Sequence, residues 1–143
     1  IFVTWAGALS ETEFKKWCIA PVAKIVKSLK AKHPGIPVIG FPRGAGAGYM
    51  SFAADTGVDA VSLDTSVPLE WARDNVQTSC AVQGNLDPLL VVAGGETMRQ
   101  EATRILETMG QGPHIFNLGH GFVPQTPPEH VAELSDLVRN WKS

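Results

Sequence analysis

The tripeptide Gly119-His120-Gly121 is the part of this sequence best suited to chemistry. It follows directly on an apolar run that ends at residue 118. An imidazole donates or accepts a hydrogen bond near neutral pH, so it can bind a carboxylate or move a proton. The flanking glycines allow positive φ and let a ligand come close to the backbone. We therefore expect His120 to serve a site; the alternative is an exposed histidine between turn glycines.

Arg43 and Thr4 are the next candidates. Arg43 lies in the glycine-rich stretch FPRGAGAG at 41–48, where a guanidinium beside free backbone N–H groups could bind a carboxylate or phosphate. A surface arginine next to a flexible turn is the alternative. Thr4 lies near the end of an apolar run, where its hydroxyl could face the site or hydrogen-bond along a sheet.

Three further polar residues near strand ends are better explained by structure than by chemistry. We expect Asp64 to cap a helix that begins near Pro68, and the alternative is an acid of the site. Asn85 and Asp87, in the stretch GNLDP, are expected to brace the turn before Pro88 through Asx hydrogen bonds.

The elements that must position these residues alternate along the chain. Apolar, β-rich runs predict five strands, at 1–5, 37–41, 58–63, 80–83 and 114–118, and a helical pattern follows each. Strict βα alternation favours a parallel sheet with right-handed crossovers, about five βα units in all. Ligands bind such sheets at the carboxyl ends of the strands, where the candidates above are expected to gather.

Local signals mark several helix boundaries. Capping boxes predict helix starts at Ser10 and at Thr126. Pro21 interrupts the first helical pattern and predicts a kink or a restart. Gly57 is expected to end the second helix, and an apolar stripe over 98–109 predicts a further helix ended by Gly110.

Two architectures are compatible with this alternation: a doubly wound α/β sheet, or part of a TIM (β/α)8 barrel. The glycine-rich stretch at 44–48 does not have the G-x-G-x-x-G spacing of a dinucleotide site. A barrel needs about 250 residues, so five units in 143 residues correspond to its C-terminal portion. An apolar run at residue 1 without Met favours this interpretation. We predict that 1–143 is the C-terminal part of one barrel domain, with the N-terminal part absent.

Composition narrows the function classes. A net charge of −2 does not favour a nucleic-acid or membrane surface, and no apolar run is long enough for a membrane span. No metal-binding or nucleophile motif is present, so no metal is expected. Cys18 and Cys80 are far apart and fit buried thiols in a reducing compartment such as the cytoplasm.

Several segments together resemble the uroporphyrinogen decarboxylase family along essentially the whole chain. The most specific are VQGNLDP at 82–88 and FNLGHG at 116–121. FVTWAG at 2–7, GVDAVSLDTS at 57–66 and TPPEHV at 126–131 also match family segments. The chain departs from the family at Thr65, where relatives often have Trp.

The resemblance implies a (β/α)8 barrel, a homodimer, no cofactor and no metal. It implies decarboxylation of the four acetate side chains of uroporphyrinogen III to give coproporphyrinogen III in haem and tetrapyrrole biosynthesis. Loss of CO2 from such an acetate requires protonation of the pyrrole ring carbon as an electron sink, then a second proton to complete the methyl group. The site must also stabilise a pyrrole cation and bind a substrate with eight carboxylates.

Carried over by position, His120 matches the family's substrate-contacting histidine and Thr4 a Ser/Thr position that contacts a substrate side chain. Arg43 matches a Lys/Arg position and is a weaker candidate for binding carboxylates. The family's pyrrole-binding aspartate, most of its substrate arginines and a site tyrosine belong to the N-terminal half. The resemblance therefore implies no catalytic residue in 1–143, and this segment alone is expected to be inactive.

Two other readings remain open at this stage. Corrinoid-protein methyltransferases share the barrel but bind zinc through His and Cys, and no cysteine follows His120 here. Alternatively, the chain is a non-catalytic half-barrel that pairs with itself or with another fragment, because five units leave two open sheet edges.

Overall fold

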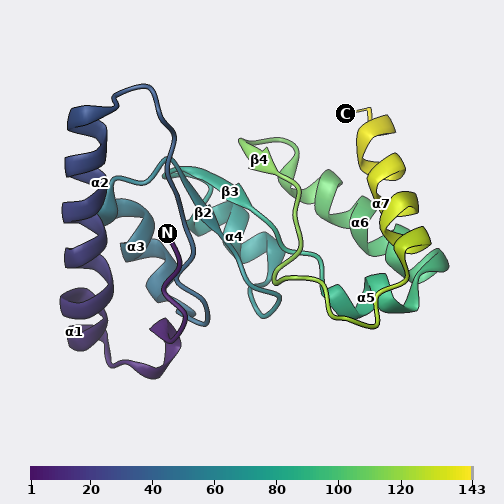
Figure 1. Cartoon of the computed structure of the whole chain (residues 1–143), viewed down its shortest axis with the longest axis horizontal. Helices are drawn as coiled ribbons and strands as arrows, with labels where there is room; N and C mark the ends of the chain where they lie inside the picture. The colour runs from purple at the N-terminus through teal and green to yellow at the C-terminus, as the bar shows by residue number, and fades with distance from the viewer. Residues whose placement is uncertain (143) are drawn as a thin grey trace.

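A computed structural model describes residues 1–142, which form one parallel sheet flanked by helices (Figure 1). The strands lie side by side in the order β1-β2-β3-β4. Their bounds are β1 Ile39–Gly40, β2 Ala60–Ser62, β3 Ala81–Gln83 and β4 His114–Ile115. The helices are α1 Glu11–Phe14, α2 Ala20–Lys32, α3 Gly48–Thr56, α4 Leu69–Asn75, α5 Pro88–Ala93, α6 Gly95–Met109 and α7 Pro128–Asn140. All strand pairs are parallel, as alternation predicts.

The first predicted strand, at 1–5, is shorter than expected. Phe2 forms a single parallel bridge to Phe41. The Val3 amide donates to the Phe41 carbonyl at 2.9 Å, and the Phe41 amide donates to the Ile1 carbonyl at 2.8 Å. The chain then turns at residues 4–5 into a short 3₁₀ helix, Ala6–Ala8, so the prediction holds for the pairing but not for the length.

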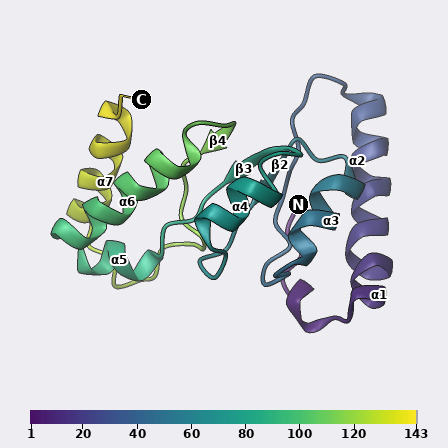
Figure 2. The ribbon, with the colours of Figure 1, turned by 180° about the vertical axis from the view of Figure 1, so that it is seen from behind.

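The two faces of the sheet are covered differently. Val61 and Val82 point to the helix side and are fully buried. Their neighbours Ser62 and Gln83 point to the other side, because successive side chains of a strand alternate between faces. Helix α4 lies behind β2 and β3 in Figure 1 and in front of them in Figure 2. A parallel sheet with helices along one face is part of a (β/α)8 barrel, since a doubly wound sheet carries helices on both faces.

The core lies between the sheet and these helices. Its largest fully buried side chains include Tyr49 and Phe52 of α3 and Met98 and Ile105 of α6. The apolar stripe predicted for residues 98–109 is thus confirmed, and Gly110 follows the end of α6 as expected.

Most of the predicted helix boundaries are confirmed. Ser10 caps α1 by accepting a hydrogen bond from the Glu13 amide at 3.5 Å. A π-helical segment, Lys15–Ile19, precedes Pro21, and α2 restarts at Ala20, as expected for a residue without an N–H. Gly57 ends α3 with φ +73°.

The capping box at Thr126 is wrong. Helix α7 begins at Pro128, so Pro127 occupies the N-cap position and no side chain caps the helix. The Thr126 hydroxyl is buried and has no hydrogen-bond partner within residues 1–142. A proline at the first helical position has already removed one free N–H, which lessens the need for a side-chain cap.

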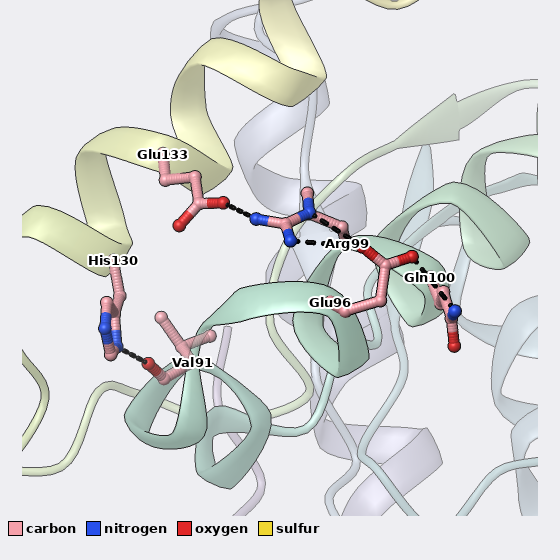
Figure 3. Close-up of polar contacts among 6 residues, drawn as sticks. All are labelled: Val91, Glu96, Arg99, Gln100, His130 and Glu133. Atoms are coloured by element: carbon pink, nitrogen blue, oxygen red, sulfur yellow. Dashed lines mark hydrogen bonds and ion pairs between the residues drawn. The ribbon is translucent and has the colours of Figure 1, made fainter.

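Helices α5, α6 and α7 are joined by polar contacts on the surface (Figure 3). Arg99 of α6 forms ion pairs with Glu96, at 3.1 Å, and with Glu133 of α7. We call these three residues the Arg99 cluster. Beside it, Nδ1 of His130 lies 2.9 Å from the Val91 carbonyl oxygen at the end of α5, and so donates to it.

Within the described part of the chain, no helix is both long and apolar enough to cross a bilayer.

Candidate active-site cleft

A cleft of about 590 Å³ lies on the helix-free face of the sheet, toward the carboxyl ends of the strands. The N-terminal segment and all four strands or the loops after them contribute to its lining, which includes Ile1, Phe2, Thr4, Ile39, Phe41, Arg43, Ser62, Gln83, Asn117, Leu118, His120 and Gly121. A parallel barrel places its ligands at this end because the βα loops meet there.

Thr4, Arg43 and His120 all line this cleft, although they come from three separate loops. All three side chains are exposed. The structure therefore brings together the residues that the sequence singled out.

His120 is held in one tautomer by its own loop. Its Nδ1 accepts a hydrogen bond from the Gly121 amide at 2.8 Å, so the neutral ring carries its proton on Nε2. Nε2 has no partner within residues 1–142 and is available to donate to a ligand. The Arg43 guanidinium likewise makes no hydrogen bond or ion pair among the described residues. Both groups are therefore free donors at the cleft.

The flanking glycines differ from their predicted roles, because neither adopts positive φ. A Cβ at Gly119 would collide with the Thr65 backbone amide and lie 2.9 Å from the Asp64 carbonyl carbon. Gly119 therefore allows two loops to pack together rather than a ligand to approach. Gly121 lies in open space at the cleft, where close approach of a ligand remains feasible.

The floor and walls of the cleft contain residues that sequence reasoning missed. Gln83 of β3 donates from Nε2 to the Ser62 hydroxyl of β2 at 3.2 Å, which gives the floor a polar pair. Phe2 and Phe41 form an apolar wall, with ring centroids 5.7 Å apart and an edge-to-face angle of 74°. A polar residue inside an otherwise apolar strand was the available signal for Ser62 and Gln83. Apolar walls with a few directed polar groups suit a flat organic ligand that carries carboxylates.

Asp64 is buried, with 6% of its surface exposed, and its role differs from the predicted helix cap. Oδ2 accepts from the Gly44 amide and the Tyr49 hydroxyl, both at 2.7 Å. Oδ1 accepts from the Ser66 amide at 2.9 Å and from the Ser66 hydroxyl. We call these four residues the Asp64 cluster. Helix α4 itself starts without a side-chain cap.

The Asp64 cluster holds its carboxyl group ionised. Burial by itself would raise the pKa of Asp64, but the hydrogen bonds from Ser66, the Gly44 amide and Tyr49 outweigh it and keep that pKa below its usual value. For Tyr49, burial and the neighbouring carboxylate both raise the pKa, so the phenol stays protonated and donates.

The structural role predicted for both Asn85 and Asp87 is confirmed for Asp87 only. Asp87 caps α5 by accepting from the Leu89 amide at 2.8 Å, which confirms the Asx interaction before the helix. Asn85 does not brace that turn. Its buried amide donates to the Asp64 carbonyl at 2.8 Å and the Val67 carbonyl at 2.9 Å, so it ties its loop to the loop after β2.

The cysteines and metal-binding residue types lie away from this chemistry. Cys18 is buried and Cys80 half-buried, and burial raises the pKa of both thiols. Over residues 1–142, no three His, Cys, Asp or Glu side chains gather in a way that could hold a metal ion.

Comparisons with known proteins agree on one family. The sequence profile described as Uroporphyrinogen decarboxylase (URO-D) matches residues 1–141. Proteins named uroporphyrinogen decarboxylase from Rhodospirillum rubrum, Granulibacter bethesdensis and Paracoccus denitrificans are 60%, 56% and 50% identical to the chain. Each alignment covers 97% of this chain but only 40% or 41% of the relative. The chain thus spans about two fifths of the length of these relatives.

Proposed function

Because this chain belongs to the uroporphyrinogen decarboxylase family, we propose that it forms the C-terminal part of an enzyme that decarboxylates uroporphyrinogen III to coproporphyrinogen III. The single observation that carries the proposal is the convergence of Thr4, Arg43 and His120 on one cleft at the carboxyl ends of the strands. These residues lie 39 or more positions apart from one another in the sequence.

The roles of the three residues follow from their hydrogen-bonding chemistry. The Nε2–H of His120 donates to a substrate carboxylate or passes a proton in the decarboxylation. The Arg43 guanidinium pairs with another carboxylate of the substrate. The Thr4 hydroxyl contacts a substrate side chain. Phe2 and Phe41 offer an apolar surface for the tetrapyrrole ring.

The remaining chemistry is assigned to parts of the protein outside 1–143. The reaction needs an acid that protonates the pyrrole carbon and an anion that stabilises the resulting cation. No carboxylate lines the 590 Å³ cleft within the described residues. We therefore propose that the N-terminal part of the barrel supplies this anion, which agrees with the share of the relatives that the chain leaves uncovered.

The proposed whole protein is a single (β/α)8 barrel that acts as a homodimer in the cytoplasm. The family resemblance supports the homodimer and the cytoplasmic location. Light scattering coupled to size exclusion on the full polypeptide that carries 1–143 tests the homodimer. A monomeric mass at micromolar concentration would contradict it.

An assay with uroporphyrinogen III under anaerobic conditions tests the function. The full polypeptide should release CO2 and accumulate coproporphyrinogen III, separated by chromatography after oxidation. His120→Asn, which keeps a hydrogen-bonding group but cannot act as an acid near neutral pH, should lower kcat/KM by at least about 10-fold. Residues 1–143 alone should show no turnover. Full activity of His120→Asn would remove the proposed role of this residue, and inactivity of the full polypeptide would refute the function.

A further inference from the structure

The Asp64 cluster lies next to the cleft but has no part in the function proposed above. Asp64 is a buried carboxylate without a cation, since no ion pair involves it among the described residues. Four hydrogen bonds from neutral donors hold it instead. A buried charge is costly unless it is satisfied in this way, so the arrangement calls for an explanation.

Oδ2 of Asp64 fixes the loop that carries Arg43. One of its two donors is the amide of Gly44, the residue that directly follows Arg43. The other is Tyr49 in the first turn of α3, the helix that this loop enters. Since the guanidinium has no partner within residues 1–142, the position of Arg43 depends on its backbone.

The backbone of Asp64 supports the loop that carries His120. Gly119 packs directly on the Asp64–Thr65 peptide, so closely that a Cβ would not fit. The Gly119 amide donates to the Leu86 carbonyl at 2.9 Å, which gives the same loop a second attachment. Asn85, next to Leu86, is in turn bonded to the Asp64 carbonyl. The loops of Arg43 and His120 therefore meet at one residue.

We propose that Asp64 is a positioning residue that sets the separation of Arg43 and His120 across the cleft, so that both reach carboxylates of the same substrate molecule. The proposal rests on the proposed function, because it assumes a polycarboxylate ligand. A substrate carboxylate is charged both before and during the reaction, so misplacing Arg43 weakens binding in both states. KM should then rise while kcat is largely kept.

A double-mutant cycle in the full polypeptide tests this. Asp64→Asn has nearly the same shape, but its NH2 group must face either the Gly44 and Tyr49 donors or those of Ser66. Asp64→Asn and Arg43→Ala should each raise KM for uroporphyrinogen III about 10-fold and change kcat by less than about 3-fold. Once Arg43 is gone, Asp64→Asn should add less than about 2-fold. Independent effects that multiply to about 100-fold, or a loss confined to kcat, would overturn the proposal.

Ser66→Ala is the matched control. It removes one hydroxyl donor to the same carboxylate but leaves the contacts with Gly44 and Tyr49 in place. It should lower stability slightly and leave KM within about 2-fold of the parent value. A KM increase equal to that of Asp64→Asn would mean that general loosening, rather than the position of Arg43, governs binding, and would also overturn the proposal.

Amide hydrogen exchange separates this proposal from the proposed function, because it needs no turnover. Asp64→Asn should speed exchange by at least about 10-fold at 43–47 and at 119–121 while β2 and β3 keep their protection. If the protein fails to decarboxylate uroporphyrinogen but shows this exchange pattern, the proposed function is refuted, while the role of Asp64 in positioning the loops of Arg43 and His120 is supported. Unchanged exchange at either loop would overturn the positioning role whatever the activity.

Discussion

The Asp64 cluster and the Arg99 cluster both join segments that are distant in sequence, but they do so in opposite ways. The first is a buried charge without a counter-charge, held by neutral donors next to the cleft. The second is a set of ion pairs on the surface between α6 and α7, where the Arg99 side chain is 43% exposed and that of Glu96 66% exposed (Figure 3). An ion pair exposed to water stabilises a protein only weakly, whereas a buried carboxylate must keep its hydrogen-bond donors in place. We therefore expect the backbone next to the cleft to be held more tightly than the surface between α6 and α7.

Removing the buried carboxylate should have the largest effect on stability. Asp64→Ala leaves the Gly44 amide, the Tyr49 hydroxyl and the Ser66 donors without their acceptor. We expect a loss of about 3 kcal/mol in the free energy of unfolding, because each unsatisfied buried donor costs about 1 kcal/mol or more. Urea unfolding of the full polypeptide measures it. A loss under about 1 kcal/mol would mean that Asp64 contributes no more to stability than a surface ion pair does, and would contradict the difference between the two clusters.

A backbone change beside the Arg99 cluster should rank second. Gly94 has φ +67° and ψ −163°, a conformation open essentially to glycine alone, and a Cβ there would overlap the His130 ring. Gly94→Ala should cost about 2 kcal/mol. Gly95→Ala is the control for the neighbouring position: its φ is +64°, but a Cβ there meets nothing within 4 Å. Equal losses for both variants would show that the His130 contact contributes nothing.

His114 on β4 belongs to neither cluster and should give a pH-dependent effect of smaller size. Burial lowers its pKa below 6.5, against a weaker opposing effect of the hydrogen bond to the Gly84 carbonyl. The unfolded chain therefore binds the proton first, and stability should fall as the pH drops below 6.5. In His114→Gln this part of the pH dependence should disappear. Urea midpoints measured at pH 7.5 and pH 5.5 for both proteins check it; identical pH dependence in the variant would contradict the assignment.

Breaking the surface ion pair should have the smallest effect. Glu133→Gln removes the charge that faces Arg99 while Glu96 remains available to it. We expect a loss of about 0.5 kcal/mol, reduced further at high salt. Thermal unfolding at two salt concentrations measures it. A loss comparable with that of Asp64→Ala would mean that the two clusters do not differ in kind.

The parallel sheet and the location of the cleft could be predicted because both depend on local patterns. Continuous apolar runs mark buried parallel strands, and alternation with helices fixes where their carboxyl ends meet. Asp87 was assigned correctly for the same reason, since its partner, the Leu89 amide, is two residues away. The capping box predicted at Thr126 was wrong, because that pattern requires a helix that begins at Pro127, whereas α7 begins at Pro128.

The role of Asp64 could not be predicted, because only Ser66 among the partners of its side chain is local, two positions away. Tyr49 is 15 positions away and lies on a helix, and Gly44 contributes only a backbone amide, which leaves no trace in a residue type. Asn85 likewise bonds to carbonyl groups 18 and 21 positions away. Side-chain contacts to backbone groups across loops depend on the folded topology, and a single sequence does not encode them visibly.

The packing of Gly119 on the Asp64–Thr65 peptide also limits how the cleft could be redesigned. Any larger residue at position 119 would collide with the Asp64–Thr65 peptide and force the loop of His120 to shift, so the size of this residue cannot be increased gradually. The wall formed by Phe2 and Phe41 is different, because these residues meet there through their side-chain rings, which can be exchanged without a backbone collision of this kind. Altered preference for the size of a bound ring should therefore be sought in libraries at Phe2, with the histidine loop left untouched.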